Sequence, residues 1–363
     1  MNNSTAEKQL ICFHIKDDYS GTPLVLSEVI EGLSTKGFAV RLYVASCSGD
    51  GFLSNLKGVD QRRFFAPSNN FRVVNRFLFF LSQFILFFSL LRYYRNDVVF
   101  YINTMWPFAA GMAGKLMNKK VIYHLHETSV KPKWLKRFLF RVLDTTASDV
   151  IYVSNYLKKK DPVVQTEPHV VHNALAPDFT ANMMPNETIE PFTVIMLCSL
   201  HKYKGIHEFV KLAARLSSVN FELVVSDTED KINSYFKNIR FSDNMTIFPA
   251  QKDVHPFYAR ASMVINLSHP DKWLETFGLT VLEAMHYGLP AIVPPNGGIS
   301  ELVKNDYNGY KISVKNLEAI TEKIYQISTD HECYHRLSKN AKEMAGNFNY
   351  SRMIHRIIDV IEN

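Results

Sequence analysis

Two glutamates separated by seven residues, Glu275 and Glu283, are the side chains whose types and spacing most clearly suggest chemistry. Gly278 stands between them, and the spacing of apolar residues over 279–285 predicts that a helix begins there. A glycine at a helix N-terminus lets an anion approach the free backbone N–H groups, so this position is a candidate seat for a diphosphate. Glu275 would then lie in the loop before the helix and Glu283 on its second turn.

The elements around the glutamates indicate a pocket at one edge of a parallel sheet. A strand is predicted over residues 262–267, directly before the glutamate loop. A second glycine-containing turn, 294–298, follows the next predicted strand and opens a short helix. Open α/β sheets bind ligands in loops at the carboxyl ends of their strands. The sequence therefore predicts a loop-built ligand pocket in the second half of the chain.

This stretch resembles the retaining glycosyltransferases of family 4. The resemblance rests on the Glu-x7-Glu spacing that encloses Phe277, Gly278 and Leu279, on the Glu-Ala-Met-x-x-Gly-x-Pro that follows, and on Gly-Gly-Ile-x-Glu-Leu at 297–302. It implies an α/β protein of the GT-B fold, with two Rossmann-like domains facing across a cleft and a C-terminal helix that crosses back to the first domain. It also implies transfer of a hexose-type sugar from a nucleotide sugar, with retention and without a bound metal ion.

The same resemblance implies roles for individual residues of the second domain. Glu283 would hold the ribose hydroxyls, Glu275 would position the sugar, and the segment Phe277–Gly278–Leu279 would contact the donor. Lys204, directly before a glycine, would neutralise the donor diphosphate. The arginine that the family usually carries five residues earlier is Ser199 here, so Lys202 is a candidate for the missing charge.

In the first domain, the resemblance implies that His126 contacts the donor sugar and that Gly21 lies near the donor phosphate and the acceptor. From the residues alone, Gly21 could equally be a glycine that a turn requires. His126 could be a strand-end histidine that bonds to backbone. A metal site formed by His124, His126 and Glu127 is a weaker interpretation, because no further ligand has a suitable spacing.

A length of 363 residues suits two domains. We predict a first domain over 1–175, a linker over 176–191, a nucleotide-sugar-binding domain over 192–346 and a returning C-terminal helix over 347–363. The four cysteines are scattered and the N-terminus lacks the pattern of a signal peptide, so a reduced, cytoplasmic setting is expected. No G-x-G-x-x-G follows the first predicted strand, which argues against an NAD or FAD enzyme.

The positive charge is concentrated in the first half of the chain. Residues 1–180 carry 22 basic and 14 acidic side chains, whereas the remainder carries 19 and 21. Such an excess suits an anionic partner, and no nucleic-acid-binding motif accompanies it. A membrane surface or a phosphorylated acceptor is therefore expected, and nucleic acid is not.

One apolar segment in this half is unusual. Residues 77–91 contain three polar side chains in 15 positions, between arginines on both sides. A spanning helix needs roughly 20 residues, so this segment is too short to cross a bilayer by that count. Two interpretations stay open: a helix buried in the first domain, or an interfacial helix with its apolar side in lipid and its arginines at the headgroups.

Together these features predict a glycosyltransferase with no cofactor, whose substrates are a UDP- or GDP-sugar and a glycan or lipid-linked glycan. It would act in surface polysaccharide or glycolipid assembly, in peripheral contact with the inner face of the cytoplasmic membrane. The alternative is a non-catalytic protein of the same fold that binds a sugar nucleotide or serves as a scaffold.

Overall fold

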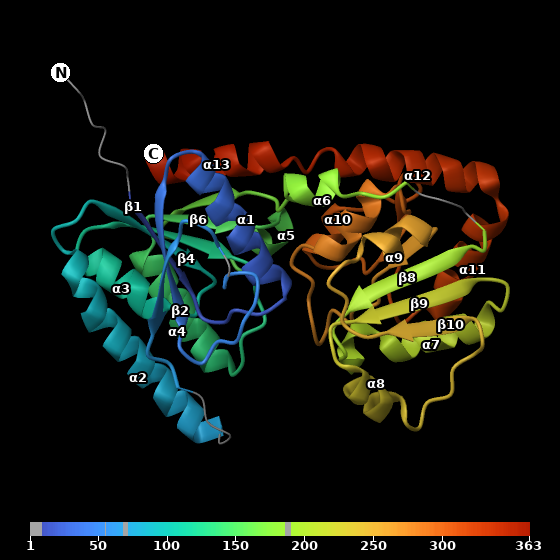
Figure 1. The fold of residues 1–363 in the computed structure, drawn as a ribbon, viewed down its shortest axis with the longest axis horizontal. Coiled ribbons are helices and arrows are strands. Elements are labelled where there is room, and N and C mark those ends of the chain that lie inside the picture. The colour runs from blue at the N-terminus through green and yellow to red at the C-terminus, as the bar shows by residue number, and fades with distance from the viewer. Residues whose placement is uncertain (1–8, 55, 68–71, 186–189) are drawn as a thin grey trace. The chain divides into compact units, whose positions relative to one another are not determined.

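The computed structural model describes residues 9–54, 56–67, 72–185 and 190–363. By their contacts the residues divide into two compact units (Figure 1). Unit 1 is Met1–His172 with Ser351–Asn363, and unit 2 is Asn173–Tyr350. The last segment thus belongs to unit 1 although it follows unit 2 in the chain.

Unit 1 is built on a seven-stranded parallel sheet in the order β3-β2-β1-β4-β5-β6-β7. The central strand β4 (Val98–Asn103) is buried at every position, as expected for a parallel strand that helices cover on both faces. The other strands are β1 (Gln9–His14), β2 (Ala39–Ala45), β3 (Asp60–Phe64), β5 (Lys120–Leu125), β6 (Asp149–Tyr152) and β7 (Glu167–Val170).

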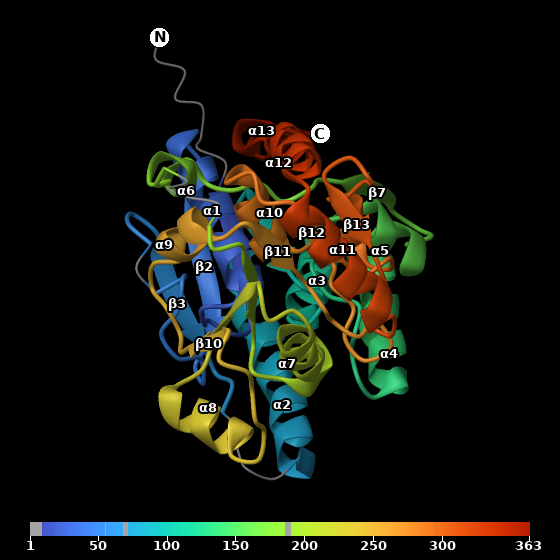
Figure 2. The ribbon, with the colours of Figure 1, turned by 90° about the vertical axis from the view of Figure 1, so that its right-hand side faces the viewer.

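Three helices of unit 1 form one layer on the sheet: α2 (Arg72–Leu90), α3 (Phe108–Leu116) and α4 (Lys133–Thr146). Helix α3 contacts both its neighbours, and Figures 1 and 2 show the three side by side. Helix α1 (Gly21–Thr35) covers the other face. The short elements are η1 (Leu91–Tyr93) and α5 (Asn155–Lys160), and α13 (Tyr350–Glu362) closes the unit with its apolar side buried.

Unit 2 has a six-stranded parallel sheet in the order β10-β9-β8-β11-β12-β13. Its strands are β8 (Thr193–Cys198), β9 (Asn220–Val225), β10 (Met245–Phe248), β11 (Met263–Ile265), β12 (Ala291–Val293) and β13 (Gly309–Lys311). Its helices are α6 (Pro177–Ala181), η2 (Lys202–Lys204), α7 (Ile206–Arg215), α8 (Glu229–Phe236), α9 (His255–Arg260), α10 (Leu279–His286), η3 (Gly298–Glu301), α11 (Leu317–Thr329) and α12 (His331–Ala345).

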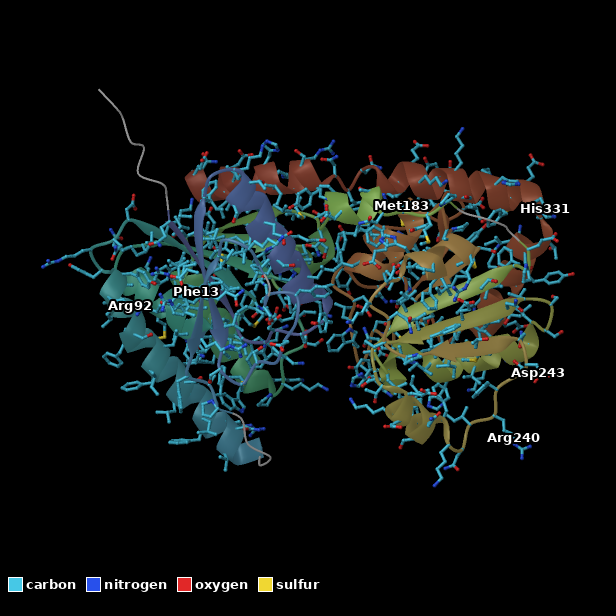
Figure 3. The ribbon with its side chains drawn as sticks, in the orientation of Figure 1. Phe13, Arg92, Met183, Arg240, Asp243 and His331 are labelled. Carbon is cyan, nitrogen blue, oxygen red and sulfur yellow. The ribbon has the colours of Figure 1, made fainter. Side chains whose placement is uncertain are left out.

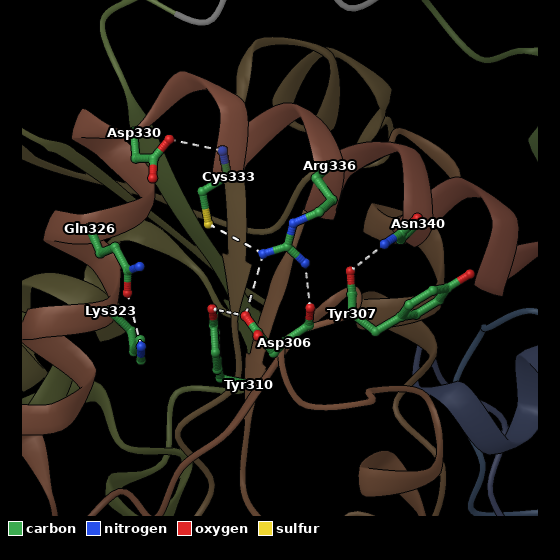
Figure 4. Close-up of polar contacts among 9 residues, drawn as sticks. All are labelled: Asp306, Tyr307, Tyr310, Lys323, Gln326, Asp330, Cys333, Arg336 and Asn340. Carbon is green, nitrogen blue, oxygen red and sulfur yellow. Dashed lines mark hydrogen bonds and ion pairs between the residues drawn. The ribbon is translucent and has the colours of Figure 1, made fainter.

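Helix α12 is tied to the loop before β13 by hydrogen bonds (Figure 4). Arg336 donates to the backbone oxygen of Asp306 at 2.5 Å, and Tyr310 donates to the carboxylate of the same residue at 2.8 Å. Asn340 reaches the backbone oxygen of Tyr307 at 2.8 Å. The helix itself begins at the capping carboxylate of Asp330. These contacts fix the edge of the sheet in unit 2.

In both sheets the strand order reverses at one point. In unit 1 it reverses between β1 and β4, and in unit 2 between β8 and β11. The loops after these strands diverge to opposite faces, which leaves a crevice at the carboxyl edge. Two Rossmann-like units were predicted, and two are present.

The boundaries differ in detail from those predicted. The units divide after His172 and after Tyr350 rather than at 175 and 346. Helix α6, inside the predicted linker 176–191, belongs to unit 2, while residues 186–189 of that linker lie outside the described residues. The cleft expected between the domains stays a prediction.

Helix α2 is not the buried helix that one of the two interpretations of residues 77–91 predicted. With η1, the apolar stretch Val74–Tyr93 has 20 residues and is long and apolar enough to span a membrane. Its most apolar 18 residues have a mean hydropathy of 1.7, but only 22% of them are buried. The length of this stretch therefore does not exclude a membrane-spanning helix, contrary to the prediction from residues 77–91. One side of α2 packs against α3 and α4, but most of its residues are not buried. It is therefore a surface helix of unit 1, not a core helix.

Candidate active site

The crevice of unit 2 holds an ion pair between its two flanking loops. Lys204, in the loop after β8, places its Nζ 2.6 Å from Oε1 of Glu275, in the loop after β11. The hydroxyl of Ser268 donates to the same oxygen at 2.7 Å. Burial alone would raise the pKa of Glu275, but the Lys204 charge and these hydrogen bonds hold it below its usual range. The carboxylate is therefore ionised and paired.

Glycines allow these loops to approach each other. Gly205 has a φ of +82°, and a Cβ there would lie 2.3 Å from the backbone oxygen of Leu267. Gly297, with a φ of +111°, packs against the backbone oxygen of Glu275, where a Cβ would lie at 2.6 Å. Any larger residue would push the Lys204 and Glu275 loops apart, so the glycines set the geometry of the ion pair.

The N-terminus of α10 opens into the same loop. Gly278 caps it with a φ of +104° and has no room for a side chain beside Ile299. The backbone N–H groups of Leu279 and Thr280 donate to no described residue. Free amides and the positive end of the helix dipole can bind an anion. The helix N-terminus at which we predicted a diphosphate seat is therefore present, at the end of the loop that carries Glu275, and its role as that seat stays a prediction.

Glu283 lies on the second turn of α10, as predicted. The hydroxyl of Tyr258, on α9, donates to its Oε2 at 2.7 Å. Burial raises the pKa of this carboxyl, and the Tyr258 bond only partly offsets it. Glu283 thus has an oxygen held by a neutral donor and no cation beside it among the described residues.

An aromatic row stands beside Lys204. The ring of Tyr203 stacks on Trp273 at 5.3 Å and on His201 at 4.9 Å between centroids. The Lys204 ammonium lies 5.0 Å from the centre of the Trp273 ring, a cation–π distance. His201 in turn contacts the hydroxyl of Ser199 at 3.2 Å. This row was not predicted from the sequence.

Two other residues predicted for the donor site, Lys202 and Phe277, take no part in the Lys204–Glu275 ion pair. Lys202 is exposed on η2 and pairs with no carboxylate among the described residues. Phe277 is buried, with its ring 5.7 Å from that of Phe348. Its side chain anchors the loop, so any contact of Phe277 with the donor would come from its backbone.

The crevice of unit 1 is lined by buried polar groups. His126 Nε2 lies 2.8 Å from the side-chain oxygen of Asn103, at the end of β4. The amide nitrogen of Asn103 lies 3.2 Å from His14, at the end of β1. Burial lowers the pKa of His126 well below its usual value, and His124 and His14 add to this. His126 is therefore neutral, and its partner is a side chain rather than backbone alone. Gly21 is the exposed first residue of α1.

Glu127, next in the chain, is a group whose importance the sequence left undecided. Its Oε1 accepts from the backbone N–H of Met105 at 3.1 Å, but its Oε2 is buried with no hydrogen-bond partner in the described structure. Burial raises the pKa of Glu127 to about 7. Nδ1 of His124 lies 2.7 Å from the hydroxyl oxygen of Tyr101. The described ranges contain no group of three or more His, Cys, Asp or Glu side chains that could hold a metal ion.

Two family models match consecutive parts of the chain. Glycosyltransferase Family 4 matches residues 19–179, and Glycosyl transferases group 1 matches residues 182–344. The chain belongs to the family 4 glycosyltransferases. Its two units therefore correspond to the two halves of one enzyme type, and the resemblance drawn from the residues around Glu275 is confirmed.

Individual relatives of this glycosyltransferase are distant. An uncharacterized glycosyltransferase of Methanocaldococcus jannaschii is 23% identical over 72% of the chain and 74% of its own length. The Escherichia coli UDP-Gal:alpha-D-GlcNAc-diphosphoundecaprenol alpha-1,3-galactosyltransferase is 28% identical, over 38% of the chain and 35% of its own length.

Solved structures establish the fold. The Anabaena protein HepE, in complex with UDP and glucose, superposes with a TM-score of 0.79 over 98% of this chain and 99% of its own, at 17% identity. The predicted GT-B fold is confirmed. The roles given above to individual residues of this glycosyltransferase stay predictions.

Proposed function

We propose that this glycosyltransferase binds a UDP- or GDP-sugar in the crevice of unit 2 and transfers its hexose with retention and without a metal ion. The observation that carries the proposal is the Lys204–Glu275 pair, which joins the loops after β8 and β11 beside the open amides of α10. A cation and free amides at one edge suit a diphosphate leaving group.

The chemistry assigns one task to each group. The bond between the sugar C1 and the diphosphate oxygen breaks, the acceptor oxygen bonds to C1 on the same face, and the acceptor proton leaves with the nucleoside diphosphate. Lys204 and the amides of Leu279 and Thr280 stabilise the charge that develops on the diphosphate. Glu275 orients Lys204 and the sugar, and Glu283 accepts from the ribose hydroxyls.

Thermal-shift binding across UDP-, GDP-, ADP-, dTDP- and CMP-sugars tests the donor. We expect one nucleotide family to stabilise the protein, and both Lys204→Ala and Glu283→Ala to abolish that shift. Lys211→Ala is the matched control, because this lysine is exposed on α7 and no role in the site was predicted for it. A shift that survives Lys204→Ala would remove the diphosphate role. No shift with any donor would favour the non-catalytic alternative, in which Ser199 reflects a lost site.

For the acceptor we propose a glycan or lipid-linked glycan, used in surface polysaccharide or glycolipid assembly at the inner face of the cytoplasmic membrane. The name of the Escherichia coli relative specifies a diphosphoundecaprenol-linked acceptor. The layer of α2, α3 and α4 supports a membrane-bound acceptor here. Its exposed apolar side chains are Val74, Phe77, Phe84, Ile85, Phe88, Met112, Leu116, Trp134 and Phe138.

Exposed cations accompany these apolar groups: Lys115, Lys133, Arg137 and Arg141. Apolar area combined with basic charge binds anionic lipid surfaces. Sedimentation with phosphatidylglycerol vesicles tests the surface. The variant Phe77→Ser/Phe84→Ser should stay in the supernatant, whereas Phe241→Ser, an equally polar change at an exposed site of unit 2, should sediment like the parent. Equal sedimentation of all three would exclude this surface.

A further inference from the structure

Three arginines line a second pocket in unit 1, away from the crevice. This pocket has a volume of about 300 Å³ and is lined by Arg41, Arg62, Arg92, Tyr93 and Asn96. Arg41 is the third of the seven residues of β2, and Arg62 is the middle residue of β3. Asn96 of the pocket precedes β4, whereas the polar groups of the crevice lie at the carboxyl ends of β1, β4 and β5, so the two sites are distinct.

The sheet holds two of these arginines in place. Arg41 and Asp60 are direct partners in the β2–β3 ladder, and Arg41 Nε lies 2.7 Å from one carboxylate oxygen of Asp60. Arg62 Nε lies 3.0 Å from the other oxygen. Arg41 also donates to the hydroxyl of Tyr93 at 2.7 Å. One carboxylate thus orients two guanidinium groups and neutralises only one of them.

Arg92 adds a third cation from η1. It pairs with no carboxylate in the described part of the chain, and it donates to the hydroxyl of Tyr43. Its guanidinium lies over the rings of Tyr43 and Tyr93, at 5.7 and 5.3 Å from their centres. The pocket therefore holds three arginines, of which only Arg41 and Arg62 pair with the one carboxylate, Asp60. Planar guanidinium groups held in this way match the oxygens of a phosphate.

The pocket adjoins the apolar surface of α2. Helix η1 continues α2 directly, and Figure 3 shows Arg92 beside the end of that helix. Phe88 and Tyr94, on either side of Arg92 in sequence, are 53% and 67% exposed. A phosphate in the pocket would thus have exposed apolar side chains next to it. A soluble phosphate would make no favourable contact with these apolar side chains, whereas a phospholipid has both a phosphate and acyl chains.

We propose that the three-arginine pocket binds the headgroup phosphate of an anionic phospholipid while the exposed side chains of α2 enter the acyl region. The site rests on the membrane contact in the proposed function but not on its donor chemistry. Vesicle binding needs no nucleotide, so the vesicle assay can be interpreted even if the protein binds no nucleotide sugar.

The test compares matched arginine and lysine variants on vesicles of phosphatidylcholine, with and without phosphatidylglycerol. Arg92→Gln, and separately Arg62→Gln, should weaken binding to the phosphatidylglycerol vesicles by on the order of tenfold or more, because each removes a charged hydrogen-bond donor to phosphate. Arg137→Gln, on the same surface but outside the pocket, should weaken it about fivefold or less, through diffuse attraction alone. Lys159→Gln, an exposed cation on α5, should change little.

Equal effects of Arg92→Gln and Arg137→Gln would overturn the pocket, because diffuse charge would then explain the binding. Inorganic phosphate separates the two sources of a phosphate group. If it raises the melting temperature of the parent but not of Arg62→Gln/Arg92→Gln, and vesicles bind both equally, the pocket is a soluble-phosphate site and the lipid assignment is wrong. Circular dichroism of the variants establishes that each is folded.

Discussion

Glu275, Glu283 and Glu127 are all partly buried, yet their carboxyl pKa values move in different directions. Burial acts on each, but only Glu275 has a cation within hydrogen-bond distance, so its pKa falls while those of the other two rise. A buried carboxylate stays ionised only where a partner offsets the lost hydration. The position of Lys204 therefore decides which of the three carboxyl pKa values falls below its usual range.

Glu127→Gln should stabilise unit 1 in a pH-dependent way. The pKa of Glu127 is about 7 in the fold, above its ordinary value of 4.5, so the folded unit pays no penalty below about pH 4.5 and the full penalty above pH 7. Glutamine does not titrate and keeps an acceptor for Met105. Urea unfolding should show equal stability near pH 4.5 and a gain of at most about 3 kcal/mol at pH 8. A gain independent of pH would contradict the ionisation argument.

Trp273→Ala should weaken UDP binding through Lys204. A cation–π contact contributes about 0.5–2 kcal/mol, so the loss of affinity should be roughly twofold to thirtyfold, and Trp273→Phe should restore most of it. In a Lys204→Ala background, where weak binding is followed at millimolar UDP, Trp273→Ala should have no further effect, as titration of the four proteins would show. Additive losses would mean that Trp273 supports the loop without acting on Lys204.

The sequence identified residues that belong to a motif and missed those that acquire a role by folding. Glu275, Glu283 and Lys204 could be named because their neighbours and spacing are specific. Tyr258 could not, because a tyrosine on a separate helix has no sequence signal that pairs it with Glu283. Trp273 is similar: only the meeting of two loops places it beside Lys204.

At the scale of elements, the contact between the β8 and β11 loops depends on a glycine. Gly205→Ala would add a Cβ 2.3 Å from the backbone oxygen of Leu267, in a left-handed conformation. Gly288→Ala is the matched control in unit 2: its φ of +79° is similar, but its Cβ meets the flexible end of Lys342. Gly205→Ala should lower the unfolding free energy by about 1–3 kcal/mol more than Gly288→Ala does, because the backbone of Leu267 cannot move aside as the side chain of Lys342 can.

Calorimetry and nucleotide titration of these two glycine variants measure the prediction together. Gly205→Ala should also lose affinity for the nucleotide, because the loop that carries Lys204 must shift. Gly288→Ala should keep its affinity. Equal unfolding free energies for the two variants would show that the loops tolerate separation.

Elements with strong apolar patterns were predictable, and others were not. The run around β4 and the periodic spacing of α7 and α12 mark buried strands and amphipathic helices. Strand β3 was missed because Asp60–Phe64 is mostly polar and lies at the sheet edge, where one neighbour suffices. Helix α2 was ambiguous because apolar composition is the same for a buried helix and for one that faces lipid.

At the scale of the whole molecule, unit 1 is completed by α13. Ile357 of this helix is fully buried, so Ile357→Ala should destabilise unit 1 by about 2–5 kcal/mol. Hydrogen-exchange mass spectrometry should show faster exchange in β1, β4 and β5, with unit 2 unchanged. Nucleotide affinity of unit 2 should also be unchanged. Faster exchange in both units alike would mean that α13 stabilises the molecule as one cooperative block.

The return of the chain to unit 1 has a consequence for biosynthesis. Apart from its last residue, Tyr350, all of unit 2 precedes Ser351–Asn363 in the chain, so unit 1 cannot complete its fold until after unit 2 has been translated. During that interval the apolar surface that α13 covers is open. The nascent first half is therefore the part of this protein with most need of a chaperone.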